Sequence, residues 1–268
     1  VRPFIKVAEL FGSTQEAVVG RTDADFFDAA TVARLRVNDL RVVQHGERVE
    51  EEEANLSADG GEEHTYLSVK LPLRRPDGTV HALCGISTDI TRQKQSERAI
   101  HQLAFYDPLT QLPNRRLLME RLQHALTAQK RSNTCGALLF IDLDNFKDLN
   151  DTRGHDVGDM LLQQVAQRLI KCVRSADTVA RLGGDEFVIL LTEISDTTAC
   201  EEVLERMLST IRQPIQITGK VTTRVSTSIG VTTYPTDNSP PSVLLEHADQ
   251  AMYRAKRSGK NRWAFYKA

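Results

Sequence analysis

The sequence is poor in cysteine and aromatic residues and has no long apolar run. Its 268 residues include only four cysteines and one tryptophan. No two cysteines form a C-x-x-C pair, which argues against a zinc site and against a disulfide framework. They are Cys84, Cys135, Cys172 and Cys200. We therefore expect buried, reduced thiols in a cytoplasmic protein.

Two further absences narrow the class of protein. No apolar run can span a bilayer, and the first residues lack a signal-peptide pattern, so we expect any membrane tether to lie outside this chain. The net charge is -2, from 34 Lys and Arg against 36 Asp and Glu. This balance provides no basic surface for general nucleic-acid binding. The composition is that of a globular protein.

The first ninety residues differ from the rest in their pattern of expected helices and strands. They contain short helical patches, such as residues 4–20, and two strand-like runs at 64–75 and 80–91. The turn signal Pro76-Asp77-Gly78 joins the two runs. The acidic run from Glu50 to Glu53 comes before them and is read as a solvated strand or loop face.

Helices and strands alternate after Asp107-Pro108, where we place a domain boundary. A helix over 114–129 is followed by a strand over 135–146 that is apolar on both faces and therefore central. A helix over 157–173 leads into a hairpin at Gly183-Gly184, and further helices and strands follow. The core order is β-α-β-β-α-β, which predicts an α+β fold with a layered sheet and helices on one face.

Two pairs of acids are expected to converge at one edge of this sheet. Asp142 and Asp144 end the central strand and, two residues apart, point to the same side. Asp185 and Glu186 follow the glycines of the hairpin, which can neighbour that strand. Each acid alone fits a solvated strand end or turn. Together they suit a hard cation such as Mg²⁺, and no His or Cys cluster favours zinc.

The neighbouring residues add the features of a phosphate site. Gly183 and Gly184 permit positive φ and a close approach of a ligand to the backbone, although a plain hairpin turn would also explain them. Lys147 supplies a cation near the acids, and Asn150 and Asp159 offer donors and acceptors for the edge of a base. A loop followed by a helix cap is the structural alternative for this segment.

Residues 183–187, GGDEF, resemble the signature of the GGDEF diguanylate cyclases. Three further segments match that family in order and spacing: YDPLTQLPNRR at 106–116, IDLDNFKDLNDTRGHDVGD at 141–159 and AMYRAKRSGKN at 251–261. Four ordered motifs are far more specific than any one of them. The resemblance implies a nucleotidyl-cyclase-like, ferredoxin-like palm fold.

The resemblance also implies a role for each matched residue. Asp142, the backbone carbonyl of Leu143 and Asp185 would hold Mg²⁺, or Mn²⁺ in its place, against the triphosphate of GTP. Asp185, with Glu186 beside it, would help deprotonate the attacking hydroxyl, and Lys147 would neutralise phosphate charge. Substrate contacts are implied for Phe146, Asn150, Asp159, Gly183, Gly184, Lys256 and Lys260.

The implied reaction condenses two GTP molecules into cyclic di-GMP and releases pyrophosphate, mainly by positioning and metal electrostatics. Each domain would hold one GTP, so the active form is at least a homodimer. Arg174 and Asp177 match the R-x-x-D inhibitory product site of the family, and Arg206 supplies a second arginine, which predicts product feedback. Asn145 and Lys260 depart from the family's usual residues, which concerns affinity more than activity.

The N-terminal part is similar to a PAS sensory domain, on residues 9–27 and 64–94. The predicted domains are a PAS-like sensory domain over 1–92, a helical signalling linker over 93–106 and a cyclase domain over 107–268. The chain begins after the place of the opening strands of that family, which predicts an incomplete PAS core.

Three hypotheses follow for the whole chain. The first is an active cyclase that consumes GTP and is regulated by the N-terminal module. The second is a silent receptor of GTP or cyclic di-GMP, although the acids that such receptors usually lose are intact here. The third makes the chain the front of a longer protein with a cyclic di-GMP phosphodiesterase domain. A mononucleotide cyclase fits Asn150 and Asp159 less well.

Overall fold

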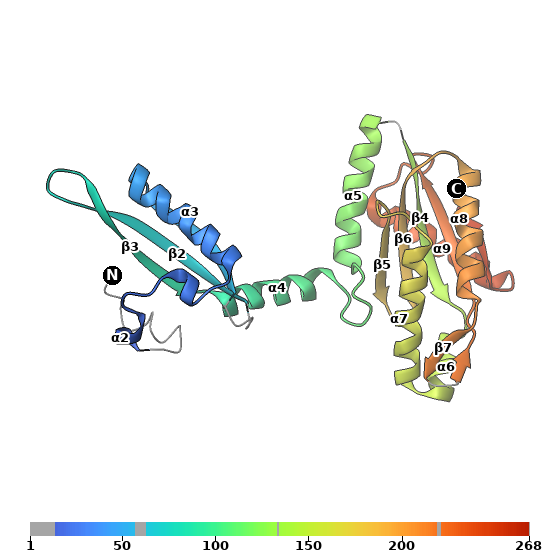
Figure 1. Ribbon diagram of the computed structural model, residues 1–268. Coiled ribbons are helices and arrows are strands. Elements are labelled where there is room, and N and C mark those ends of the chain that lie inside the picture. Colours follow the sequence, from blue (N-terminus) through green and yellow to red (C-terminus); the bar gives the residue numbers. More distant parts are fainter. Residues whose placement is uncertain (1–13, 57–62, 133, 219–220, 268) are drawn as a thin grey trace. The chain divides into compact units, whose positions relative to one another are not determined.

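A computed structural model of the chain describes residues 14–56, 63–132, 134–218 and 221–267. The chain divides into two compact units, residues 1–99 and 100–268 (Figure 1). None of the helices in the described ranges is long and apolar enough to cross a membrane. The domain boundaries at 92/93 and 106/107 stay predictions.

The N-terminal unit is a three-stranded antiparallel sheet with one long helix packed on it. The strands lie in the order β1-β2-β3, and α3 contacts all three of them. Asp28 caps α3 by accepting a hydrogen bond from the Thr31 N–H, and Gly46 ends the helix at φ 67°. The elements are α2 (Gln15–Val18), the 3-10 turn η1 (Asp23–Asp25), α3 (Ala29–His45), β1 (Val49–Leu56), β2 (Glu63–Arg74) and β3 (Val80–Asp89).

This unit differs in two ways from the expectation. The helix α3 has 17 residues, where only short helical patches were expected. The acidic run belongs to a strand, β1, and is not wholly solvated, because Asn38 donates hydrogen bonds to Glu51 and Glu53. The β2–β3 turn at Pro76-Asp77-Gly78 is confirmed. Residues 4–13 of the first predicted patch lie outside the described residues.

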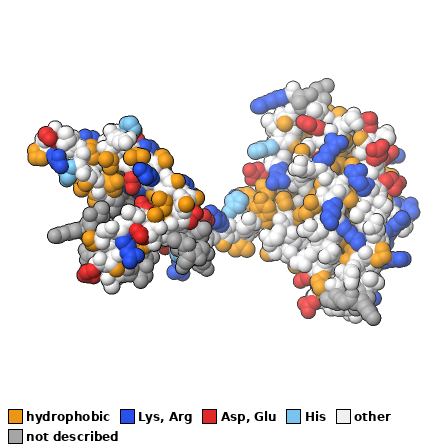
Figure 2. Space-filling model, viewed as in Figure 1, with side chains coloured by type: hydrophobic (Ala, Val, Ile, Leu, Met, Phe, Trp, Pro, Cys, Tyr) orange, Lys and Arg blue, Asp and Glu red, His pale blue; other side chains and the backbone are white. Residues whose placement is uncertain are grey.

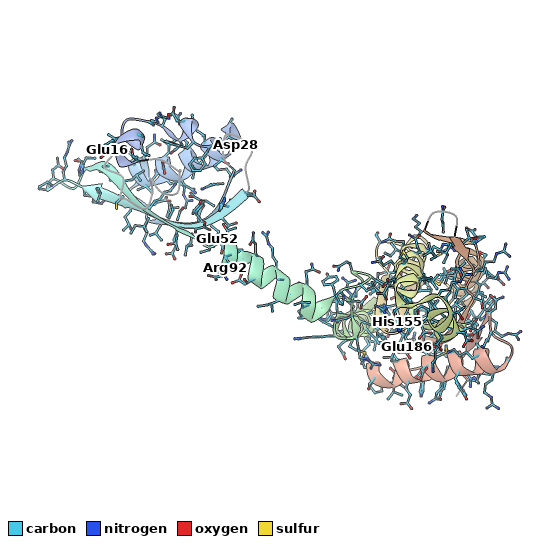
Figure 3. All side chains as sticks on the ribbon, turned by 90° about the horizontal axis from the view of Figure 1, so that it is seen from below. Glu16, Asp28, Glu52, Arg92, His155 and Glu186 are labelled. Carbon is cyan, nitrogen blue, oxygen red and sulfur yellow. The ribbon has the colours of Figure 1, made fainter. Side chains whose placement is uncertain are left out.

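The helix α4 (Thr91–Phe105) follows β3 directly. Its first turn lies against the N-terminal sheet, because Lys94 Nζ is 2.7 Å from a carboxylate oxygen of Glu52 on β1. Figure 3 labels Glu52 and Arg92 at this junction. The helix was predicted over 93–106.

The C-terminal unit is a five-stranded sheet in the order β10-β9-β4-β6-β5. The chain passes through β4, α7, β5, β6, α8 and β9, which confirms the predicted β-α-β-β-α-β core. The remaining strands, β7 and β8, form a separate hairpin. The elements are α5 (Arg115–Ser132), β4 (Cys135–Leu143), α6 (Phe146–Arg153), α7 (His155–Lys171), β5 (Thr178–Gly183), β6 (Glu186–Ile194), α8 (Thr197–Ile211), β7 (Ile215–Thr218), β8 (Val221–Thr223), β9 (Thr227–Tyr234), α9 (Pro241–Arg257) and β10 (Arg262–Phe265).

Helices cover both faces of this sheet, so the expectation of helices on one face was wrong. Alternate residues of β4 enter different cores: Leu139 packs with residues of α7 and α8, and Leu138 packs with residues of α5 and α9. In Figure 1, α7 lies in front of the strands. Because β4 is buried on both faces, its end can hold a charged side chain in a largely dry environment.

The four cysteines differ in how exposed they are. All four cysteines are free, but only Cys172 and Cys200 are buried, whereas Cys84 is half-buried and Cys135 is exposed. The expectation of buried thiols therefore holds for two of them. On the face drawn in Figure 2, Lys and Arg side chains of the C-terminal unit lie among Asp and Glu side chains rather than in one block.

Candidate active site

Asp142 lies near the end of β4, between its partners Glu186 on β6 and Ser228 on β9. The residue is 7% exposed, and its Oδ1 lies 2.6 Å from Nζ of Lys256 on α9. This contact is an ion pair, and Oδ1 lacks a hydrogen bond of good geometry. A metal ion that binds this oxygen would therefore share it with the Lys256 ammonium or displace it.

The acids around Asp142 affect one another's ionisation. Burial raises the pKa of Asp142 to about 6, against the effect of Lys256, and the charge of Asp185 adds to the rise. Burial also raises the pKa of Glu186, with Asp249 and Asp185 contributing. The expected convergence of acids is therefore present, and its repulsion is what a cation relieves.

Asp144 behaves differently from Asp142, although only one residue separates them. Three donors hold its carboxylate: Ser228 Oγ at 2.8 Å, Ser226 Oγ at 2.6 Å and the backbone N–H of Asn261 at 3.1 Å. A carboxylate with three donors is satisfied within the fold. Asp144 therefore fixes the loop after β4, and Asp142 is the acid of this strand that remains for a ligand.

The hairpin turn is shifted by one residue from the expected position. Gly183 pairs with Glu186, so the two turn residues are Gly184 and Asp185 rather than the two glycines. Gly183 has φ 147° and Gly184 has φ 50°, and a Cβ at either position would meet no atom within 4 Å. Backbone conformation, and room for a ligand close to the backbone, therefore explain these glycines better than packing does.

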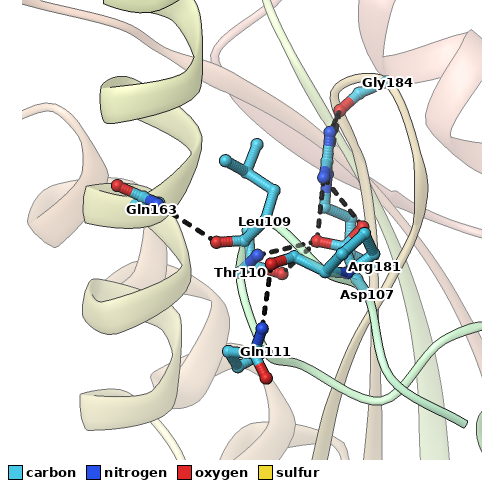
Figure 4. A network of polar contacts seen from close by, with 8 residues as sticks. Asp107, Leu109, Thr110, Gln111, Gln163, Arg181 and Gly184 are labelled. Carbon is cyan, nitrogen blue, oxygen red and sulfur yellow. Dashed lines mark hydrogen bonds and ion pairs between the residues drawn. The ribbon is translucent and has the colours of Figure 1, made fainter. Parts of the chain in front are cut away.

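A buried arginine, which the sequence reasoning missed, holds this turn in place (Figure 4). Arg181 is 9% exposed and donates from Nη1 to both oxygens of Asp107, at 2.8 and 3.0 Å. Its Nε and Nη2 donate to the carbonyl oxygen of Gly184, at 3.1 and 2.7 Å. Thr110 also donates to Asp107 through its N–H and its hydroxyl. Asp107 lies in the motif at 106–116 and Arg181 lies two residues before the GGDEF motif, but only the fold brings them together.

The segment between β4 and α7 is the helix α6 rather than a loop, and it carries Asn150. Asn150 Oδ1 is buried without a partner among the described residues, and a Cβ on Gly158 would lie 1.9 Å from it. The glycine therefore allows Asn150 to approach α7, where Asp159 is exposed. The ring of Phe146 is 8% exposed and packs into the core, so it supports this segment rather than presenting a face to a ligand.

The three lysines predicted to act on the substrate differ in their surroundings. Lys147 is exposed in the first turn of α6. Lys256 pairs with Asp142, as described above. Lys260 donates from Nζ to Asn145 Oδ1 at 2.6 Å, and both residues have positive φ, 59° and 60°. The structure therefore brings Lys256 and Lys260 to the end of β4.

The residues predicted for product feedback lie around the turn between α7 and β5. Asp177 accepts hydrogen bonds from the Arg174 N–H at 2.9 Å and the Thr192 N–H at 3.0 Å, so its carboxylate fixes this turn. Arg206 donates to the carbonyl oxygen of Cys172, at 2.9 and 3.2 Å. Arg174 and Arg206 are both exposed, so a ligand can reach both guanidinium groups.

The acidic site does not amount to a complete metal cage. Among the described residues, no three His, Cys, Asp or Glu side chains are grouped so as to hold a metal ion. Mg²⁺ usually takes only one or two carboxylates from a protein, with waters and substrate phosphates as further ligands. Asp142 and Asp185, with the Leu143 carbonyl, fit that pattern.

Comparisons with known proteins agree with this geometry. The family described as "Diguanylate cyclase, GGDEF domain" matches residues 104–262, and the "PAS fold" family matches residues 5–95. The diguanylate cyclase of Vibrio cholerae is 32% identical over 263 residues, which cover 97% of this chain and 80% of that protein.

Several relatives come from Pseudomonas aeruginosa, among them MucR and TpbB. The bifunctional diguanylate cyclase/cyclic di-GMP phosphodiesterase MucR is 43% identical over 178 residues, 66% of this chain and 26% of that protein. The solved GGDEF domain of TpbB is 37% identical with a TM-score of 0.59, and the match covers 60% of this chain and 94% of that one. The chain spans only 26% to 38% of the length of full-length MucR and TpbB. From the family match and the shared fold, we conclude that this chain belongs to the GGDEF diguanylate cyclase family and carries a PAS fold before its GGDEF domain.

Proposed function

We propose that the chain is an active, Mg²⁺-dependent diguanylate cyclase that condenses two GTP molecules into cyclic di-GMP. The observation that carries the proposal is the register of β4 with β6, which pairs Asp142 with Glu186 next to the turn residue Asp185. A silent receptor would not need this costly group of acids.

The reaction exchanges two phosphorus–oxygen bonds for two others. The 3'-oxygen of each GTP bonds to the α-phosphorus of the other, the bond from that phosphorus to the β-phosphate oxygen breaks, and each GTP releases one pyrophosphate. Asp185 and Glu186 take up the hydroxyl proton. Burial raises the pKa of Glu186, which makes its carboxylate a stronger base than that of an ordinary glutamate. Lys147 and Lys256 balance charge on the phosphates, and the backbone at Gly183 and Gly184 allows their close approach.

The residues present fit a magnesium ion. Asp142 offers a buried carboxylate that is now paired with Lys256, Asp185 a carboxylate on the turn, and Leu143 a backbone carbonyl. When bound, Mg²⁺ (or Mn²⁺) supplies charge neutralisation and orientation of the phosphates. Asp107 and Arg181 position the turn that carries Asp185.

Asn150 and Asp159 are proposed to recognise guanine. The unpartnered Oδ1 of Asn150 accepts a hydrogen bond, and the carboxylate of Asp159 accepts from the base amino and imino groups. One GTP per domain requires two domains face to face, so the active form is a homodimer. A second proposal is that the natural protein also contains a phosphodiesterase domain. It is supported by the bifunctional relative MucR, of whose length this chain spans 26%.

The test is to incubate the purified chain with GTP and Mg²⁺ and to separate the nucleotides chromatographically. We expect cyclic di-GMP and pyrophosphate from the parent and from Glu202→Ala, which removes an exposed carboxylate on α8. Asp185→Ala should give none. If the parent binds GTP but forms no product after bound nucleotide has been stripped, the receptor hypothesis replaces this one.

Product feedback is tested separately. Arg174→Ala should relieve inhibition by added cyclic di-GMP and leave the initial rate unchanged, because the Arg174 side chain is exposed and its backbone N–H to Asp177 is retained. Unaltered inhibition in this variant would remove Arg174 from the proposed product site.

A further inference from the structure

The N-terminal unit contains a hollow of about 200 Å³ between its helices and its sheet. Its lining combines charged, polar and apolar side chains: Asp23, Phe27, Leu35, Asp39, Glu53, Asn55, Tyr66, Lys70, Leu83 and Ser87. This volume is below the roughly 300–1,000 Å³ of pockets for drug-sized ligands. An occupant is therefore a small molecule.

The charges of the lining do not balance. Three carboxylates face the hollow, and the single cation is Lys70, which is 7% exposed. Lys70 Nζ lies 2.9 Å from Asp39 and 3.1 Å from Glu53, so its charge is already engaged. Asp23, at the exposed mouth, forms no ion pair with any residue that the structure describes. Burial and the charges of Asp39 and Glu53 raise its pKa, while Lys70 opposes the rise. Keeping this many charges together is costly unless a further cation compensates them.

A second, independent observation concerns hydrogen bonding. Asn55 is 8% exposed and lines the hollow, and its Oδ1 has no partner among the described residues. A buried acceptor of this kind costs free energy until a donor reaches it. The hollow therefore offers an unpartnered acceptor and an excess of negative charge, which suit a ligand that donates hydrogen bonds and carries positive charge.

We propose that this hollow binds a small organic ammonium ion, whose N–H groups donate to Asn55 and Asp23. The aromatic side chains of Phe27 and Tyr66 add faces that attract an ammonium group. Leu35 and Leu83 provide apolar surface for a short alkyl chain. A divalent metal fits less well, because Lys70 already pairs with Asp39 and Glu53 and much of the lining is apolar or aromatic.

The test is calorimetric titration of the full chain with n-butylammonium and with 1,4-diaminobutane. The neutral 1-butanol serves as a control for alkyl burial, and MgCl₂ and CaCl₂ as controls for metal. We expect the amines to bind and 1-butanol to bind at least about tenfold more weakly, since a charge-assisted hydrogen bond is lost. Equal binding of 1-butanol, heat from the metals alone, or no heat from either amine overturns the proposal.

Two variants locate the site. Asp23→Asn and Asn55→Leu should each weaken amine binding by about tenfold, the loss of one charge-assisted hydrogen bond. Asn55→Leu also removes an unsatisfied acceptor, so the free energy of unfolding should not fall, which separates lost binding from misfolding. Glu52→Gln is the matched control. Glu52 lies on the same strand as Asn55, but its side chain is 52% exposed and pairs with Lys94, so amine binding should not change. Parent-like binding by both site variants overturns the assignment.

Discussion

Arg181 and Asp107, 74 residues apart in the sequence, form a bidentate ion pair at 2.8 and 3.0 Å with both side chains largely buried. The same guanidinium holds the Gly184 carbonyl, so one side chain connects the start of the GGDEF domain to the turn that bears Asp185.

Arg181→Ala should reduce the free energy of unfolding by roughly 3–5 kcal/mol, because it leaves the carboxylate of Asp107 partly buried without its partner. Urea denaturation followed by circular dichroism measures this. Lys171→Ala, which removes an exposed cation on α7, should change the value by less than about 0.5 kcal/mol. A loss for Arg181→Ala no larger than for Lys171→Ala would contradict the role given to the ion pair.

Asp142 should make the metal-free protein less stable as the pH rises. Its folded pKa of about 6 lies above the unfolded value of 3.8, so between these values the folded state binds more protons and stability falls with increasing pH. At ~1.36 kcal/mol per pKa unit, the loss above pH 6 is of the order of 3 kcal/mol. The Asp142→Asn variant has no ionisable group at this position, so it should not show this loss of stability with rising pH.

The measurement is urea denaturation in EDTA from pH 4 to pH 7.5. We expect the difference in stability between Asp142→Asn and the parent to grow in favour of the variant across this window. Parallel pH profiles of the two proteins would show that Asp142 ionises normally.

Gly158→Ala should weaken GTP binding without touching the nucleotide directly. The new Cβ would lie 1.9 Å from Asn150 Oδ1 and 3.2 Å from Phe146 Cζ, so the Asn150 side chain must move. We expect KM for GTP to rise about tenfold, equivalent to ~1.4 kcal/mol. If the effect acts through Asn150, adding Gly158→Ala to Asn150→Ala should cause little further change in a double-mutant cycle.

The four cysteines should react with a thiol reagent in a fixed order. Cys135 is exposed and should react first, and Cys84 more slowly. Cys172 and Cys200 should react only after unfolding, and burial raises the pKa of Cys200 to about 12. Counting reactive thiols with and without urea checks this, and a fast-reacting Cys200 would contradict its packing in the core.

The order of elements in the C-terminal unit was predictable from the alternation of apolar patterns, but the placement of its helices was not. A strand that is apolar on both faces requires cover on both, which β4 receives from four helices. The short helix α6 escaped prediction because its eight residues contain only two apolar side chains, Phe146 and Leu149.

The acids of the site were predictable as a group, but not individually. Asp142 and Asp144 look equivalent in the sequence. Their difference arises from donors at residues 226, 228 and 261, more than eighty positions away. Such long-range partners leave no local signal, and the same holds for Arg181 and Asp107.

The contacts of Lys260 and Asn261 with the loop after β4 have a consequence for the order of synthesis. These two residues reach Asn145 and Asp144 across 115 and 117 positions of the chain. Domains generally fold as units during synthesis, the N-terminal one first. Strand β4 is therefore made long before the residues that fix its end, and the nucleotide site matures only when the last turn of this domain has been added. A nascent chain that stops before residue 260 would contain the complete GGDEF motif but would lack the contacts that fix the loop after β4.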